Sequence, residues 1–183
     1  MIQNSNLVKF SSLLFYLIPL ALLTGPFIPD LFISIISVIF LYYCYKKKLI
    51  KYFTNKFFIL FIIFYAYLII NSLLSEYTLF SLESSIFYFR FGIFSLATWF
   101  LVEHNDKFFS HFKIIFLFTF LFAILDGYIQ YIYGVSLFGF GIKEIPRLSL
   151  SFNDKLILGG YLARLFTILI ALLLLGKNNI LKY

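Results

Sequence analysis

The chain has 183 residues, of which 62% are hydrophobic and only 13% are charged, and its mean hydropathy is +0.98. Soluble domains are about 45–50% apolar and about 25% charged, and a chain this short cannot bury so much apolar surface in its own core. The composition therefore excludes a soluble enzyme or binding domain. It predicts a single all-α integral membrane domain, because the apolar runs lack the alternation of a lipid-facing β-barrel.

The net charge of +7 does not predict a nucleic-acid partner, because the basic residues lie between apolar segments and not on one soluble face. The single cysteine, Cys44, excludes an intrachain disulfide and a cysteine-based metal cluster. No His/Glu pair has metal-ligand spacing, and no glycine-rich loop follows a strand. We therefore expect no metal and no cofactor.

A transmembrane helix needs about 20 apolar residues, with a range of about 17–25. Gly25-Pro26 and Pro29-Asp30 are turn signals that separate the first two apolar runs. The chain contains six runs of about this length, at residues 7–23, 28–45, 57–74, 85–102, 114–133 and 156–175. We expect about six transmembrane helices with almost no mass outside the bilayer.

The lysines predict the orientation of these spans. The loop after the second span is the richest and carries Lys46, Lys47, Lys48, Lys51 and Lys56, and Lys107 and Lys113 follow the fourth span. The positive-inside rule therefore places both chain termini and the lysine-rich loops in the cytoplasm. The tyrosines at the end of the second span, Tyr42, Tyr43 and Tyr45, then fall at the inner membrane interface.

The three arginines lie away from the lysine-rich loops. Arg90 is inside the fourth span, Arg147 is in the last external loop, and Arg164 is inside the sixth span. All ten basic residues assigned to the cytoplasmic side are lysines, although topology alone would use either residue type. A guanidinium grips phosphate or carboxylate bidentately and an ammonium does not, so the distribution predicts that the arginines bind an anion.

Four polar residues are expected at a similar depth below the outer surface. At 1.5 Å per residue, Arg90 lies about 8 Å and Arg164 about 12 Å into their spans. Asp126 lies about 10 Å deep, and Gln130, four residues later, shares its helix face. Buried ionisable groups cost about 2.5–3.5 kcal/mol each and usually face a cavity or a partner. An outward-facing polar pocket is therefore expected.

A structural explanation of Asp126 is also possible. Its carboxylate could pair with Arg90 or Arg164 and lock two helices together. That pairing would leave one deep arginine and Arg147 without a role.

The other charged residues predict no second site. His104 and His111 lie in the loop after the fourth span, on the wrong side for the pocket, and are expected to be ordinary surface histidines. Five further charged residues are expected to be solvated loop residues: Glu76, Glu83, Glu144, Asp154 and Lys155.

Short motifs surround these arginines and Asp126. In chain order they are Tyr88-Phe89-Arg90-Phe91, Asp126-Gly127-Tyr128-Ile129-Gln130-Tyr131, Gly134 with Phe138-Gly139, Arg147-Leu148-Ser149, Phe152-Asn153-Asp154 and Gly160-Tyr161-Leu162-Ala163-Arg164. Their order and spacing on the expected outer side resemble the bacterial O-antigen ligase and O-antigen polymerase family of multi-span membrane proteins.

The resemblance implies glycosyl transfer at the outer face of the bacterial inner (cytoplasmic) membrane. The donor would be a glycan on an undecaprenyl-diphosphate carrier, and the acceptor would be lipid A core or a growing polymer. Family arginines imply that Arg147 and Arg164, together with Arg90, hold the donor diphosphate. Guanidinium groups would stabilise the charge of the leaving diphosphate without a metal, and apolar helix walls would suit the polyprenyl tail.

The chain also departs from the family. The resemblance covers all of this chain but only the first half of a family member, whose later external loop carries the catalytic histidine. Leu150 stands where the family tends to have glycine after the Arg-x-Ser motif. We therefore expect these 183 residues to bind donor without turning it over alone, and a missing C-terminal half or partner subunit to complete the enzyme.

Two other functions fit the same residues. A transporter or flippase component for an anionic lipid-linked substrate would use the same arginine pocket and would move lipid without breaking a bond. A structural membrane subunit would need only the buried ion pair and no substrate.

Overall fold

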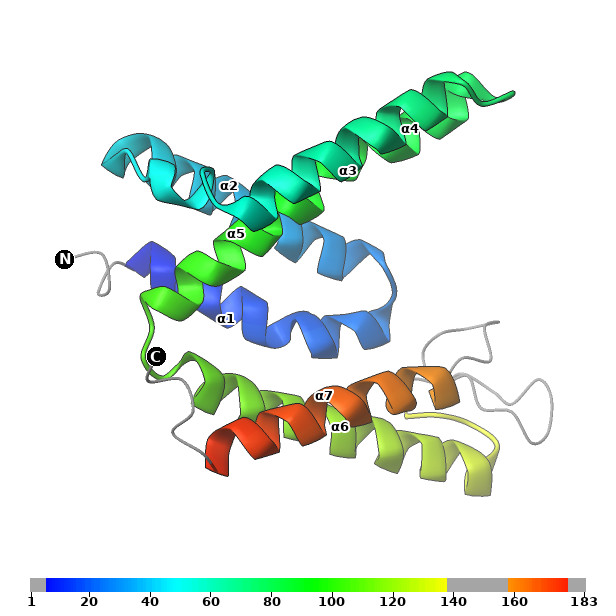
Figure 1. Cartoon of the computed structure of the whole chain (residues 1–183). Helices are drawn as coiled ribbons and strands as arrows, with labels where there is room; N and C mark the ends of the chain where they lie inside the picture. Colours follow the sequence, from blue (N-terminus) through cyan, green and yellow to red (C-terminus); the bar gives the residue numbers. More distant parts are fainter. Residues whose placement is uncertain (1–5, 138–157, 178–183) are drawn as a thin grey trace. The chain divides into compact units, whose positions relative to one another are not determined.

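The computed structural model describes residues 6–137 and 158–177. Within these residues 87% of the chain is helical and no strand occurs, which confirms the all-α prediction for this part. Five helical segments of the described chain are long and apolar enough to cross a membrane (Figure 1). By length and composition, the chain is therefore a multi-pass membrane protein.

The first two spans are α1 (Asn6–Ala21), which the 3-10 helix η1 (Leu22–Thr24) continues, and α2 (Phe27–Lys47). Gly25 joins them with a φ of +115°, a conformation that L side chains rarely adopt. Pro29 and Asp30 were interpreted as a turn signal, although the predicted span began at residue 28, and they lie inside the first turn of α2. Proline is tolerated there because the first turn leaves its N–H groups without helical acceptors.

The third span is α3 (Lys56–Leu73), and the fourth combines α4 (Thr78–Phe87) with α5 (Phe89–Glu103). Tyr88 between them has helical dihedral angles, φ −63° and ψ −24°, so the helix runs on from Thr78 to Glu103. It begins about two turns earlier than the predicted start at residue 85. Glu83, predicted in a loop, is instead an exposed residue of α4, where glutamate is a good helix former.

Small and polar residues hold α3 against its neighbours. The hydroxyls of Ser72 on α3 and Ser85 on α4 form a hydrogen bond with each other. A Cβ atom on Gly92 of α5 would lie only 2.1 Å from Cε1 of Phe61 on α3, so glycine is what permits this close approach. Small residues and interhelical hydroxyl bonds are typical contacts between helices in lipid, where no hydrophobic force drives association.

The fifth span is α6 (Phe108–Tyr133), and α7 (Leu158–Lys177) coincides with the sixth predicted span. His111 and Lys113, predicted in a loop, lie in the first two turns of α6, because the helix extends beyond the apolar run that defined the span. The described apolar part of α7, Leu158–Leu174, is shorter than the five long spans. The structure thus supports five spans, and the sixth remains a prediction.

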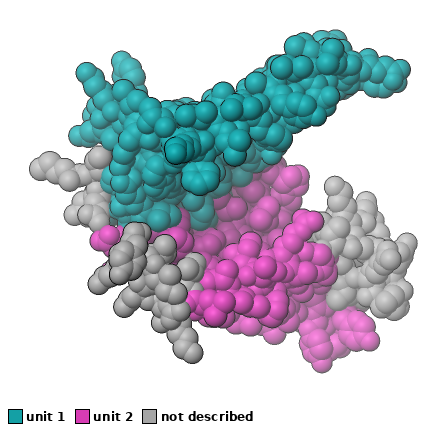
Figure 2. All heavy atoms as spheres, viewed as in Figure 1, with its two compact units in different colours: residues 1–15, 31–105 teal, residues 16–30, 106–183 magenta. Residues whose placement is uncertain are grey.

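The chain divides into two compact units (Figure 2). Unit 1 comprises residues 1–15 and 31–105, and unit 2 comprises residues 16–30 and 106–183. The core of unit 1 is aromatic: the ring of Phe40 lies 5.7 Å from that of Phe100, and Tyr43 lies 5.6 Å from Phe100. Tyr43 is therefore buried in this core, whereas Tyr42 and Tyr45 are exposed.

Unit 2 is built around the contact of α6 with α7. Leu165, Leu169 and Leu172 form a buried stripe on α7 that packs with Phe116 of α6. Their spacing of three to four residues places them on one helix face. At the start of α7, Leu158 packs with Ala123 of α6 and with Leu23 of η1.

Candidate functional site

The buried face of α6 changes from apolar to polar towards its C-terminal end. The side chains of Asp126 and Gln130 are 1% and 0% exposed, and Gly127 beside them is also buried. The spacing of four residues puts the carboxylate and the amide on one face, as the sequence predicted. An apolar helix thus carries two fully buried polar side chains within one turn of each other.

The Asp126 carboxylate binds the chain that follows α6. Its Oδ1 accepts a hydrogen bond of 2.6 Å from the backbone N–H of Leu137. Gly134 ends α6 in the left-handed conformation, with φ +75°, and its N–H donates to the carbonyl of Gln130 at 2.9 Å. Together the glycine cap and the carboxylate fold residues 134–137 back onto α6, an arrangement typical of helix C-termini.

The start of α7 is also fixed within unit 2. Leu158 packs against Ala123 of α6, three residues before Asp126. One turn further along α7, the hydroxyl of Tyr161 donates a hydrogen bond of 2.7 Å to the carbonyl of Pro19. The two described ends of the chain around residues 138–157 therefore lie against neighbouring positions of α6.

The structure places two of the three arginines, and their surroundings differ. Arg164 is an exposed residue of α7 in unit 2, and Arg90 is a half-buried residue of α5 in unit 1. The Arg90 guanidinium lies 5.0 Å from the centre of the Phe91 ring, within cation–π range. Arg147 lies outside the described residues. Of the predicted pocket residues, the structure therefore brings together Asp126 and Gln130.

Arg90 also differs from its expected depth along the helix. It lies twelve residues after Thr78, which corresponds to about 18 Å from the start of the α4–α5 helix at 1.5 Å per residue. The sequence placed it about 8 Å from the start of its span. The difference arises because the helix begins at Thr78, about two turns before the apolar run that defined the predicted span.

A pocket of about 610 Å³ lies within unit 1, between α3 and α5. Its walls are mainly aromatic and include Phe58 and Phe61 of α3 and Phe91 of α5. Arg90 does not line it, although the adjacent Phe91 does. This pocket is apolar and therefore differs from the polar pocket expected from the sequence.

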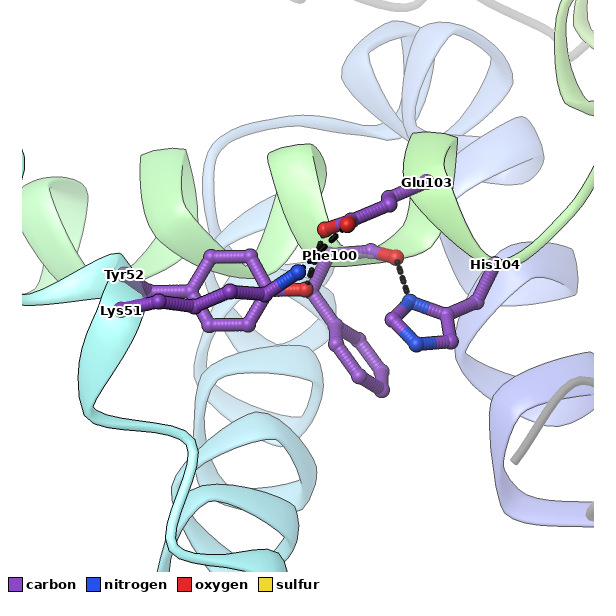
Figure 3. Close-up of polar contacts among 5 residues, drawn as sticks. All are labelled: Lys51, Tyr52, Phe100, Glu103 and His104. Atoms are coloured by element: carbon purple, nitrogen blue, oxygen red, sulfur yellow. Dashed lines mark hydrogen bonds and ion pairs between the residues drawn. The ribbon is translucent and has the colours of Figure 1, made fainter. Parts of the chain in front are cut away.

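A second polar cluster joins the segment before α3 to the end of α5 (Figure 3). Tyr52, in the 3-10 helix η2 (Ile50–Tyr52), donates from its hydroxyl to Oε2 of Glu103 at 2.6 Å. Lys51 forms an ion pair with the other oxygen, Oε1. Because Tyr52 is fully buried while Lys51 and Glu103 are partly exposed, the cluster lies at the edge of the unit 1 core.

Burial, and then the hydrogen bond to Glu103, raise the pKa of Tyr52 well above its usual range. The phenol therefore stays neutral and acts as a donor at physiological pH. His104 lies beside the cluster, with its ring 4.4 Å from that of Phe100 and its Nδ1 2.9 Å from the Phe100 carbonyl. It is half-buried and caps α5, which corrects the prediction of an ordinary surface histidine.

The sequence contained a signal for this cluster that the arginine pattern obscured. Glu103 is an acidic residue at the end of a span whose neighbouring loops are rich in lysine. A carboxylate in such a position is expected to pair across loops, although its partner among five lysines could not be selected without the fold. Among the described residues, no group of three or more His, Cys, Asp or Glu side chains could hold a metal ion.

Comparison with protein-family models, curated proteins and solved structures gives no match to this chain.

Proposed function

We propose that the chain is the membrane portion of a glycosyltransferase of the O-antigen ligase or polymerase type, acting on the outer face of the bacterial inner membrane. It binds a glycan carried on undecaprenyl diphosphate. The observation that carries the proposal is the buried pair Asp126 and Gln130 near the C-terminal end of the apolar helix α6. Polar groups in lipid are costly and usually mark a substrate path or a polar partner.

Arg164 and Arg147 supply the diphosphate contacts in this proposal. The exposed position of Arg164 on α7 leaves its guanidinium accessible to a ligand. Guanidinium groups bind diphosphate oxygens in a bidentate manner. They also stabilise the charge that develops when the glycosyl–diphosphate bond breaks.

Asp126 acts as a positioning residue in this proposal. Its bond to the Leu137 N–H fixes the point at which the chain leaves α6 towards Arg147. No catalytic base is assigned in this chain, so donor binding without transfer is the expected behaviour of the isolated polypeptide. In this proposal a partner supplies the catalytic base.

Donor binding can be measured on the purified chain in lipid nanodiscs by native mass spectrometry with undecaprenyl diphosphate. Arg164→Lys keeps the positive charge but loses the planar guanidinium group. It should weaken binding about tenfold if two guanidinium N–H groups bind the diphosphate together. Arg164→Gln should weaken it further. Lys113→Gln is the matched control, because it removes a charge near the N-terminal end of α6, far along the helix from Asp126. This variant should bind the lipid as the wild type does.

Wild-type binding by both Arg164 variants would contradict the proposal, as would equal binding of uncharged undecaprenol. Transport of a labelled lipid-linked glycan across vesicles without bond cleavage would instead support the flippase function. One observation supports the alternative of a structural subunit: the hydrogen bond from the Leu137 N–H accounts for the buried Asp126 carboxylate without any ligand. Loss of lipid-linked-glycan processing in cells carrying Arg147→Gln would count against it.

A further inference from the structure

The pocket between α3 and α5 has two unlike ends. Phe61, Tyr88 and Phe91 enclose one end with aromatic rings. Asn55 and Trp99 line the other end, at the point where α3 begins. At about 610 Å³ the pocket falls within the range of about 300–1,000 Å³ that is typical of small-ligand sites with apolar walls and few polar groups.

The end at Asn55 is flanked by lysine. The segment 46–56 that leads into it contains five lysines and no acidic residue. One of them, Lys51, is paired with Glu103. Lys56, the first residue of α3, is exposed and lies between Asn55 and Phe57, which both line the pocket. The electrostatic field at this end therefore favours an anion.

The Lys51–Tyr52–Glu103 cluster holds this end in place. The ring of Tyr52 meets that of Trp99 edge-on at 5.1 Å, so the buried phenol supports one wall of the pocket. Asn55 caps α3 by accepting a hydrogen bond of 3.1 Å from the Phe57 N–H. The groups that line this end of the pocket, Asn55 and Trp99, are thus held in place by their own contacts.

Acyl chains fill a pocket that opens to lipid. An acyl chain alone gains little binding free energy there, because the bilayer is as apolar as the pocket. Selectivity must come from the head group. Basic sites between transmembrane helices at the cytoplasmic surface bind anionic lipid head groups, at about 1 kcal/mol per lysine or arginine. Tryptophan also favours this level of the membrane, where its ring is buried and its N–H reaches polar groups.

We propose that the α3–α5 pocket binds one anionic glycerophospholipid, with an acyl chain between the aromatic walls and its phosphate at Lys56 beside Asn55 and Trp99. This proposal does not depend on glycosyl transfer. It would make the packing of α3 on α5 sensitive to the anionic lipid content of the membrane.

Trp99 is the only tryptophan of the chain and lines the pocket, so its fluorescence reports the occupant directly. The full chain would be reconstituted in phosphatidylcholine vesicles that contain either brominated phosphatidylglycerol or brominated phosphatidylcholine at equal fractions. Bromine atoms on an acyl chain quench tryptophan at contact. Brominated phosphatidylglycerol should quench Trp99 at several-fold lower fraction than brominated phosphatidylcholine.

Two variants test the two parts of the site. Lys56→Gln should reduce the preference for phosphatidylglycerol about fivefold, the typical effect of one lysine at a membrane surface. Ser95→Phe places a ring in the pocket from its α5 wall and should abolish the preference. Lys9→Gln on α1 and Ser84→Phe on α4 are the matched controls, because both residues are exposed and neither lines the pocket.

Equal quenching by the two lipids would overturn the proposal, and so would a wild-type preference in Ser95→Phe. Quenching that falls as the protein-to-lipid ratio rises would also overturn it, because a second copy of the chain would then cover the pocket. Phosphatidylglycerol selectivity that is lost in both pocket variants and kept in both controls would establish the site.

Discussion

Two carboxylates of this apolar protein, Glu103 and Asp126, obtain their hydrogen-bond donors in different ways. Glu103 ends α5 with its side chain 39% exposed, and it is bound by Lys51 and Tyr52. Asp126 lies inside α6 at 1% exposure and accepts from the backbone N–H of Leu137. A carboxylate near water can use a cation and be replaced at little cost, whereas a buried one depends on the donors that the fold itself provides.

The largest effect is expected for Asp126→Leu. The substitution replaces the carboxylate with an apolar side chain of similar size and leaves the Leu137 N–H without its acceptor, at a cost of about 2–3 kcal/mol. Unfolding of the purified chain in mixed micelles would measure the loss. Asp126→Asn retains an acceptor oxygen and should recover most of the stability. Equal stability of Asp126→Leu and wild type would show that the buried bond contributes nothing.

Glu103→Gln should destabilise unit 1 by about 1–1.5 kcal/mol, because charge-assisted bonds to Lys51 and Tyr52 become neutral ones. The same measurement on Glu83→Gln, at an exposed position of α4, should show a change below about 0.5 kcal/mol. If both variants lost the same amount, the cluster at the end of α5 would have no special role.

Gly134→Ala tests whether the cap or the carboxylate holds the chain after α6. An L residue at φ +75° should cost about 1 kcal/mol, because the left-handed region crowds its Cβ atom. Gly134→Asn, which tolerates this region better, should cost less. A larger loss in Gly134→Ala than in Asp126→Leu would reverse the ranking of the two contacts.

The last prediction concerns Tyr52 and a change in stability with pH that begins only above neutral pH. Since burial raises the pKa of Tyr52 above the usual value of about 10, folding favours the neutral phenol. Its contribution to stability is complete below about pH 10 and is lost as the pH rises further. The stability difference between wild type and Tyr52→Phe should therefore be constant from pH 7 to about 9.5 and shrink above it. A constant difference to pH 11 would contradict the raised pKa.

The helical spans were predictable because their apolar runs are far longer than a soluble core needs. The errors fell at the ends, where Glu83, His111 and Lys113 continue a helix whose backbone bonds do not depend on side-chain polarity. Hydropathy locates apolar runs, and it does not locate the residues at which a helix begins. Most of α6 was therefore correct while its first turns were not.

The site was predictable only in part. The spacing of Asp126 and Gln130 sufficed to place both on one helix face. The partner of Asp126 could not be read from the sequence, because the donor is a backbone N–H and every residue except proline carries one. The Lys51–Tyr52–Glu103 cluster was missed for a related reason, since its residues are 51 and 52 positions apart and no local pattern links them.

The fold-back at Leu137 and the packing of Leu158 bring the end of α6 and the start of α7 to neighbouring positions. The two anchor points on α6, Asp126 and Ala123, are separated by about 4.5 Å along the helix axis. Because both anchors lie within one turn of the same helix, forming one contact lowers the entropic cost of forming the other. The two contacts should therefore be lost together when either one is removed.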